Sequence, residues 1–283
     1  MTGYGSNDIT FLEAFNHYME AFELGLYGAH EIEHPVVFVI GAPRSGTTIM
    51  TQILSYGLGA GYIPNLAARF WRAPVTGLRL AREVLGPREH WSPGFASTHA
   101  RTHEPDGIHE FGYFWKYWLD VGEDGIPSGD FWRMYRMRDA IANIVHELGA
   151  PWVCKGIYPA YVANEIDDPL DGNVLWVHVK RDYNDTCASI LQAQRMTGRY
   201  PWFGWRPPNY KELEKTPGGA ERVQEQVKWC HRSYGRISDI TVQLERLAED
   251  PDGVVEDVAR VIGCTGMRPI PPGAIRAPKT YKL

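Results

Sequence analysis

The stretch "VVFVIGAPRSGTTIM", residues 36–50, decides the fold of this 283-residue chain. Five mostly β-branched apolar residues, 36–40, lead into a turn with two glycines, and the pattern from Thr47 to about Leu58 is typical of a helix. Apolar residues on both faces indicate a strand in a parallel sheet that is covered on both sides. A glycine-flanked turn between strand and helix directs backbone N–H groups and the helix dipole into one concavity. The turn is therefore predicted to bind a phosphate group.

Strands and helices alternate along the rest of the chain. Helices are expected over 11–26, around 78–84, from Asp130 to 148, and over 184–197, 220–238 and 252–262; further strands are expected over 152–155, 174–179 and 240–244. This alternation indicates an α/β fold in three layers, P-loop-like, with a central parallel sheet flanked by helices on both faces. The length fits a single domain over 1–283, with its core at about 35–265.

The composition of the chain argues against several classes of protein. A formal net charge of −5 argues against a general nucleic-acid binder. No apolar run approaches the ~18 residues of a membrane helix, and "MTGYGSNDIT" at the start has no signal-peptide pattern. The four cysteines are far apart, which indicates reduced thiols in a cytoplasmic protein and gives no zinc-ligand spacing: Cys154, Cys187, Cys230 and Cys264.

The turn differs from the loop that binds nucleoside triphosphates. The spacing from Gly41 to Gly46 fits G-x-x-x-x-G-K-[ST], but Thr47 stands where that loop has its lysine. Because this lysine neutralises the β- and γ-phosphates, its absence argues against a kinase or ATPase. The one cation of the turn is Arg44. An ordinary tight connection between strand and helix is the alternative interpretation.

The turn "GAPRSGTT", residues 41–48, resembles the 5′-phosphosulfate loop of sulfotransferases that use 3′-phosphoadenosine 5′-phosphosulfate (PAPS). Arginine at position 44 resembles the branch with tyrosylprotein, carbohydrate and many bacterial sulfotransferases, whereas cytosolic members often have lysine there. The resemblance implies a sulfotransferase with PAPS as co-substrate and no metal. Its reaction is in-line attack of a hydroxyl on the sulfonate, with Arg44 beside the sulfonate and the leaving oxygen.

A second segment, "VLWVHVKRDYNDTCAS", residues 174–189, resembles the family's 3′-phosphate site. The family has an arginine at a strand end and a serine eight residues later, as Arg181 and Ser189 are here; Tyr183 replaces the usual proline. Alternatively, Arg181 pairs with a neighbouring aspartate, Asp182 or Asp185, on a solvated surface. The donor-binding residues implied by both segments are Pro43, Arg44, Ser45, Gly46, Thr47, Thr48, Arg181 and Ser189.

Two weaker matches lie elsewhere in the chain. Residues 240–263 resemble the family's late strand and closing helix, with Glu245 as a marker of the fold. Lys155 in "WVCKGIYP" resembles a lysine that ends another central strand of this branch. A strand-end lysine that faces solvent is the alternative for this position. Together the matches cover about 36–263.

The general base is expected in "THEPDGIHEFGYFW", residues 102–115, because the resemblance places it between the two phosphate segments. Glu110 is the first choice, since the pattern around it resembles acidic segments of the arginine-containing branch. His109 and His103 follow, because a histidine titrates near neutral pH. Surface polar groups or residues at a helix start are the alternatives, and Glu104 and Asp106 belong to the same segment.

The acceptor is expected to be a hydroxyl of a small molecule, carbohydrate or lipid, with its identity and the oligomeric state left open. Aromatic side chains either line its pocket or belong to the core: Trp202, Phe203 and Trp205 in a Pro-rich loop, and Phe70, Trp71, Trp115 and Trp118. Arg276, Lys279 and Lys282 near the end would suit the nucleotide phosphates. A P-loop phosphotransferase and a non-catalytic nucleotide-binding relative are the competing functions.

Overall fold

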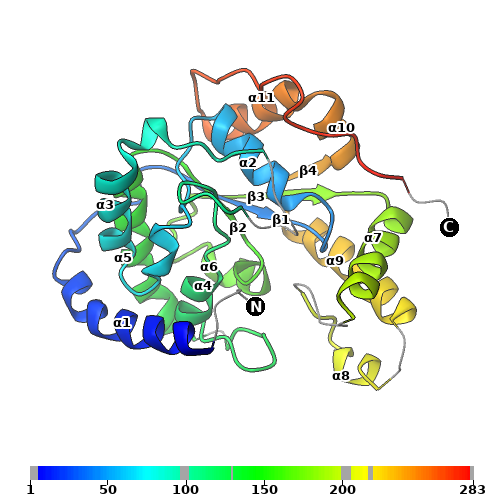
Figure 1. Ribbon diagram of the computed structural model, residues 1–283, viewed down its shortest axis with the longest axis horizontal. Helices are drawn as coiled ribbons and strands as arrows, with labels where there is room; N and C mark the ends of the chain where they lie inside the picture. Colours follow the sequence, from blue (N-terminus) through cyan, green and yellow to red (C-terminus); the bar gives the residue numbers. More distant parts are fainter. Residues whose placement is uncertain (1–5, 96–101, 129, 199–204, 216–218, 281–283) are drawn as a thin grey trace.

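Parallel strands form the central sheet of the computed structural model, which describes residues 6–95, 102–128, 130–198, 205–215 and 219–280 (Figure 1). Within these residues the sheet has four strands in the order β2-β1-β3-β4. Their bounds are β1 Val36–Ile40, β2 Trp152–Lys155, β3 Val174–Lys180 and β4 Ile240–Gln243. In register, Val36 of β1 lies opposite Trp152 of β2 and Val174 of β3. The carboxyl ends of β1, β2 and β3 therefore lie at one edge of the sheet.

Helices cover both faces of this sheet. The bounds of the α-helices are α1 Ser6–Leu24, α2 Thr47–Gly57, α3 Pro74–Leu85, α4 Gly112–Trp118, α5 Phe131–Leu148, α6 Ala163–Ile166, α7 Tyr183–Thr197, α8 Tyr210–Leu213, α9 Ala220–Ile237, α10 Leu244–Glu249 and α11 Pro251–Ile262. Short 3₁₀ turns are η1 Ala67–Arg69, η2 Arg88–His90 and η3 Pro159–Val162. Of the helices described, none combines the length and apolar character needed to cross a membrane.

The core divides into two layers because successive side chains of a strand point to opposite faces. Val37 and Val39 of β1 pack with α2, α10 and α11. Phe38 and Ile40 face the other way, into a larger cluster with α4, α5 and part of α9. All five residues of β1 are buried, as its apolar sequence predicts for a central parallel strand. The predicted α/β fold with helices on both faces is confirmed (Figure 1).

Several element boundaries differ from the sequence prediction. The strand expected over 240–244 ends at Gln243, because Leu244 already begins α10 and packs in the core. The N-cap of α11 is Asp250, which accepts from the N–H of Gly253, and not Asp252. Helix α4 was not predicted, because seven residues with mostly aromatic side chains show no clear helical periodicity. The cap predicted at Asp130 is confirmed by its bonds to two backbone N–H groups of α5.

Aromatic side chains fill the larger core layer. Trp115 of α4 stacks on Trp152 of β2 with ring centroids 5.6 Å apart, and Phe38 of β1 meets Trp115 edge-on at the same distance. Trp71 and Trp118 are buried in the same cluster, and Phe70 packs edge-on against Phe15 of α1. These tryptophans therefore belong to the core, which was one of the two interpretations of the sequence.

Helix α3 receives its cap from α1. Its own N-cap residue, Ala73, has no side chain that can accept a hydrogen bond. Glu23, buried at 1% exposure, accepts from the N–H of Val75 at 2.6 Å and from the N–H and hydroxyl of Thr76 at 3.0 and 2.7 Å. A carboxylate at this place satisfies orphan N–H groups and complements the helix dipole. The contact fixes α1 against α3.

We expect Glu23→Ala to lower the free energy of unfolding by about 2 kcal/mol, because it removes a cap and leaves buried N–H groups without a partner. Urea denaturation followed by circular dichroism measures the change. Glu13→Ala is the matched control, since Glu13 lies exposed on the same helix and should change stability by less than about 0.5 kcal/mol. Equal effects of the two substitutions would contradict the capping role.

Candidate functional site

The turn after β1 holds its shape through close backbone approach. A side chain at Gly41 would place its Cβ 2.5 Å from the carbonyl oxygen of Val179 and from Oγ of Ser45. Gly46 adopts φ 99° and would bring a Cβ within 2.5 Å of the Leu244 side chain in α10. Both positions therefore require glycine. As the N-cap of α2, Gly46 supplies no side-chain cap, so the first N–H groups of the helix have no partner from this residue.

Two residues within the turn carry features typical of a binding site. Arg44 has φ 68°, a left-handed conformation that costs energy for a residue with a side chain. Oγ of Ser45 is fully buried and has no hydrogen-bond partner within the described structure. A buried hydroxyl without a partner destabilises the fold unless a ligand or water satisfies it. The turn thus offers donors for an anionic group such as a phosphate.

The second phosphate segment meets the turn directly. Nε of Arg44 donates to Oγ of Ser189 at 3.3 Å, and Nη1 of Arg181 donates to the carbonyl oxygen of Arg44 at 3.2 Å. Arg181 and Ser189 are 6% and 4% exposed, so the interpretation of Arg181 as a solvated surface residue is wrong. Asp182 caps α7 by accepting from the N–H of Asp185, which orients the helix that carries Ser189. Segments 137 residues apart in sequence therefore form one site.

Lys155, at the end of β2, adds a third cation from the other side of β1. Its side chain is only 2% exposed, so the solvent-facing interpretation is wrong. Its Nζ donates to Oγ1 of Thr48 at 2.7 Å and pairs with Oε1 of Glu110 at 2.5 Å. A buried ammonium requires such partners, because an unpaired charge in the interior is strongly destabilising. The lysine joins the phosphate turn to the segment expected to hold the base.

Glu110 lies at the rim of the site, with 43% of its side chain exposed. The backbone around it is fixed on both sides. The N–H of His109 donates to the carbonyl of Ile63 at 2.9 Å, and Phe111 has a left-handed φ of 54° at the start of α4. A carboxylate that is half-exposed beside a buried ammonium can meet both a ligand and the site interior.

The two histidine candidates lie in different environments. The Nδ1 atom of His109 accepts a hydrogen bond from the N–H of Phe111 at 2.9 Å. In the neutral ring the proton therefore sits on Nε2, which leaves that nitrogen without a lone pair to take up another. His103 is exposed. The backbone around His103 is held by the side-chain amide of Asn65, which donates to the hydroxyl of Thr102 and to the carbonyl of Glu104.

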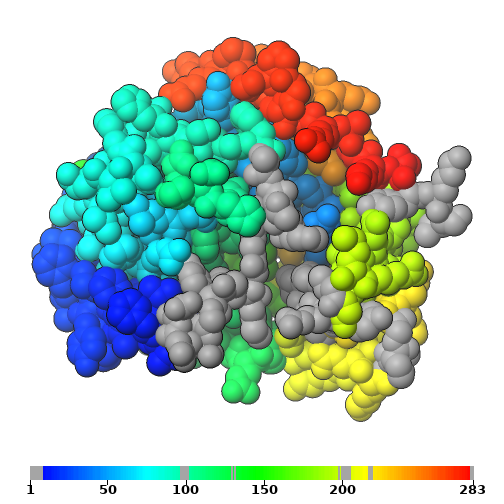
Figure 2. All heavy atoms as spheres, in the orientation of Figure 1, coloured from blue at the N-terminus to red at the C-terminus, as the bar shows by residue number. Residues whose placement is uncertain are grey.

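The C-terminal segment, residues 268–280, reaches the same site. It begins beside the end of α2, where the N–H of Arg268 donates to the carbonyl of Gly57 at 2.8 Å. At its other end Nη2 of Arg181 donates to the carbonyl of Lys279. In Figure 2 this segment (red) passes from the helices at the top toward α7 (yellow-green). The side chains of Arg276 and Lys279 are exposed.

The remaining predicted residues lie at the start of α2, in the core, or in the part of the chain that is not described. Thr48 is buried beside Lys155, and Thr47 begins α2 with its carbonyl accepting from the hydroxyl of Thr51 at 2.8 Å. Trp205 is buried against Tyr234, with ring centroids 4.7 Å apart. The other candidates, Trp202, Phe203 and Lys282, lie outside the described residues.

A histidine that the sequence analysis did not single out lies behind the segment that carries Arg181 and Ser189. His178 of β3 is 1% exposed, and neither of its ring nitrogens has a hydrogen-bond partner in the described structure. Its ring lies 5.6 Å from that of Tyr234 and 6.2 Å from that of His231. Burial lowers the pKa of His178 to about 4, and the charges of His231 and Lys180 act in the same direction. The imidazole is therefore neutral in the folded protein near pH 7.

Comparisons with known proteins give a consistent but distant likeness. No protein-family model matches the chain, and no curated protein matches it. The sulfotransferase STF1 from Mycobacterium tuberculosis H37Rv is 15% identical, covering 90% of this chain and 73% of that chain with a TM-score of 0.49. STF9 from Mycobacterium avium is 14% identical, covering 88% and 67% with a TM-score of 0.49. The sulfotransferase domain of the Synechococcus PCC 7002 olefin synthase is 16% identical, covering 84% and 76% with a TM-score of 0.40.

We expect His178 to make the protein acid-sensitive. The pKa of this group rises from about 4 in the folded chain to 6.5 in the unfolded chain, so the unfolded state binds more protons between these values. The free energy of unfolding is therefore highest above pH 6.5, where His178 is neutral in both states. It falls by up to about 3 kcal/mol as the pH is lowered toward 4. Urea denaturation across this range should give a shallower pH dependence for His178→Leu than for the natural chain. Parallel profiles would contradict the assignment.

Proposed function

We propose that the chain is a sulfotransferase that moves a sulfuryl group from PAPS to a hydroxyl of a small-molecule, carbohydrate or lipid acceptor. The observation that carries the proposal is the contact of Arg44 with both Arg181 and Ser189. A ligand with a single phosphate needs only one phosphate-binding segment, whereas PAPS carries phosphate on both the 5′ and the 3′ positions of its ribose. Two phosphate-binding segments that meet at one sheet edge fit a donor of that kind.

In this proposal the turn binds the 5′ end of the donor and the second segment binds its 3′-phosphate. Ser45, Thr47 and Thr48 would hold the 5′-phosphate together with the N–H groups of the turn, and the unpartnered hydroxyl of Ser45 supports this fit. Arg181 and Ser189 would hold the 3′-phosphate, with the fork of the guanidinium matched to its oxygens. Arg181 now donates to the carbonyls of Arg44 and Lys279, so donor binding exchanges at least one of these acceptors for phosphate.

The chemical step needs a group at each end of the transferred sulfonate. Glu110 takes the proton of the acceptor hydroxyl as its oxygen forms a bond to sulfur, while the bond from sulfur to the leaving phosphate oxygen breaks. Arg44 neutralises charge that develops on that oxygen; it stays protonated throughout. Lys155 lies between Glu110 and Thr48, where its ammonium holds the carboxylate at the turn and adds positive charge near the sulfonate.

Glu110 is the better candidate for the base than His109 in this arrangement. The hydrogen bond from Phe111 occupies Nδ1 of His109, and the neutral ring then presents a protonated nitrogen to the site. Glu110 has an acceptor-only carboxylate group at the half-exposed rim of the site, where an acceptor hydroxyl can reach it. His109 remains a candidate in a rotated orientation, and His103 a more remote one.

Two further parts of the proposal concern the whole chain. We propose one domain over residues 1–283, because segments far apart in the sequence, around Arg44 and Arg181, meet at one edge of a single sheet. The four cysteines are free thiols, which supports a cytoplasmic location. A non-catalytic nucleotide-binding relative and a P-loop phosphotransferase are the competing functions that the following experiments separate.

Donor binding is tested by calorimetry with 3′-phosphoadenosine 5′-phosphate, and with AMP, ADP and Mg-ATP as comparators. We expect selective binding of the bisphosphate, and Arg181→Ala should weaken it about tenfold or more because a charge-assisted contact to the 3′-phosphate is lost. AMP lacks that phosphate, so its weaker binding should be insensitive to the substitution. Preference for Mg-ATP would favour the phosphotransferase, and no binding of any nucleotide would contradict both.

The base is tested with Glu110→Gln, which keeps the shape of the side chain and removes its basicity. Sulfuryl transfer from PAPS to the best acceptor in a panel of phenols, sugars and long-chain alcohols should fall about 10²- to 10⁴-fold. Binding of 3′-phosphoadenosine 5′-phosphate should stay unchanged. Glu104→Gln is the matched control, because Glu104 is an exposed carboxylate of the same segment. Full activity of Glu110→Gln would transfer the base role to a histidine, and absence of turnover in the natural chain would favour the non-catalytic relative.

A further inference from the structure

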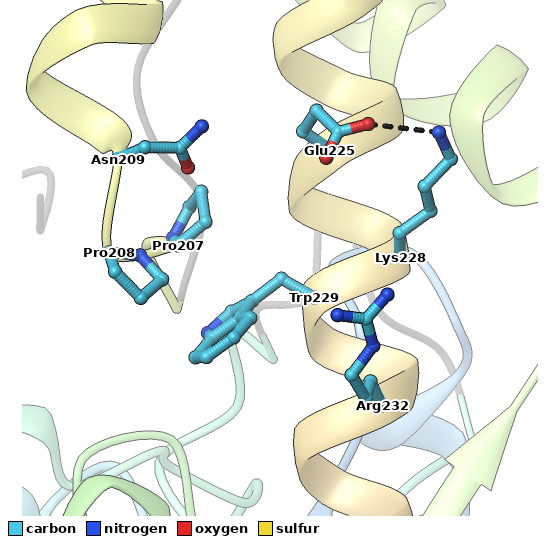
Figure 3. A pocket seen from close by; sticks show the side chains of 7 residues that line it. All are labelled: Pro207, Pro208, Asn209, Glu225, Lys228, Trp229 and Arg232. Atoms are coloured by element: carbon cyan, nitrogen blue, oxygen red, sulfur yellow. Dashed lines mark hydrogen bonds and ion pairs between the residues drawn. The ribbon is translucent and has the colours of Figure 1, made fainter.

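A pocket of about 290 Å³ lies between α9 and the segment that precedes α8. Its walls are the rings of Pro207 and Pro208, the amide of Asn209 and one face of α9 with Trp229 and Arg232 (Figure 3). Figure 3 shows the indole of Trp229 extending from α9 toward the two prolines. This volume is close to the lower end for pockets that hold small organic ligands. None of its lining residues belongs to the phosphate turn or to the 3′-phosphate segment.

The charges in this pocket leave one cation in excess. Glu225 and Lys228 also line it and pair with each other at 2.9 Å, one turn apart on α9. Arg232 has no carboxylate within ion-pair distance in the part of the chain that is described. It lies three residues after Trp229, so the guanidinium and the indole occupy the same side of the helix. The pocket therefore presents the positive charge of Arg232 beside the aromatic ring of Trp229.

The wall opposite α9 is held in place. Trp205, two residues before Pro207, is buried against Tyr234 of α9, and its carbonyl accepts from Nε2 of Gln226 at 2.7 Å. The next N–H, of Arg206, donates to the hydroxyl of Tyr161 at 2.8 Å. Two proline rings then restrict the backbone of the wall. The segment is thus fixed to α9 at its base, and the pocket exists before a ligand enters it.

We propose that this pocket binds an anionic ring compound, whose ring lies on Trp229 and the two prolines and whose carboxylate or sulfonate pairs with Arg232. Aromatic and proline surfaces provide apolar contact, and the indole favours a flat ring. The guanidinium, which has no carboxylate partner among the described residues, provides the charge complement. The amide of Asn209 provides a further polar contact at the opposite wall. The site is separate from the proposed donor site and does not depend on the sulfotransferase function.

The probe is 2-naphthoate, and its neutral counterpart is 2-naphthalenemethanol; both are titrated by calorimetry against the full chain. We expect 2-naphthoate to bind, and Arg232→Gln to weaken it about tenfold, the usual size of a charge-assisted contact. Arg236→Gln is the matched control, because Arg236 is also exposed on α9 but does not line the pocket. Trp229→Leu should weaken both compounds, whereas Arg232→Gln should leave the neutral compound unchanged.

Three outcomes would overturn the proposal: no binding of 2-naphthoate at millimolar concentration, equal loss in Arg232→Gln and Arg236→Gln, or binding that neither Arg232→Gln nor Trp229→Leu changes. Arg181→Ala provides a check on the separateness of the site. This variant should bind 2-naphthoate as the natural chain does, although its binding of 3′-phosphoadenosine 5′-phosphate is expected to fall. A parallel loss of 2-naphthoate would place the probe in the donor site and contradict a separate pocket.

Discussion

The buried ammonium of Lys155 is the interaction on which the arrangement of the site depends. Taking a charge out of water costs several kcal/mol, and only a partner of opposite charge and further hydrogen bonds offset that cost. Thr48 and Glu110 are those partners, and they come from the start of α2 and from the segment before α4. Because β2 is fixed in register beside β1, the lysine cannot reach its partners unless both segments approach the same edge. The charge therefore sets the position of the segment expected to carry the base.

Basic groups gather at this edge although the chain as a whole is acidic. Lys155 is the last residue of β2, Arg44 follows β1 and Arg181 follows β3, and parallel strands place all three at their carboxyl ends. The formal net charge of −5 therefore says little about the local field. Burial increases the effect, since Lys155 and Arg181 act through a medium of lower dielectric than water. An anion with charge at two separated points is the ligand that such an arrangement favours.

The sequence predicted those parts of the fold and site that depend on short-range patterns. The strand, turn and helix of 36–58 and the spacing of Arg181 and Ser189 are local features, and the structure brings these two segments together. Their binding of phosphate stays a prediction. The partners of Lys155 could not be predicted in the same way, because its contact to Glu110 depends on the irregular chain before α4. The left-handed conformation of Phe111, which turns the chain into α4, has no glycine or asparagine to mark it. The pocket beside Trp229 likewise depends on how a Pro-rich segment packs on a distant helix, which no local pattern records.

Two local costs to stability lie in the turn at this edge of the sheet. Arg44 takes a backbone conformation that glycine would adopt at lower energy, and Ser45 buries a hydroxyl with no partner in the described structure. Behind them, His178 buries two ring nitrogens that have no hydrogen-bond partner among the described residues. At the start of α3 such a cost is avoided, because Glu23 reaches across from α1 to cap that helix. A chain selected for stability alone would keep neither the strained arginine nor the unpartnered serine. Their retention in one turn is explained if an anionic ligand satisfies both, because the energy lost in the free protein is then recovered on binding.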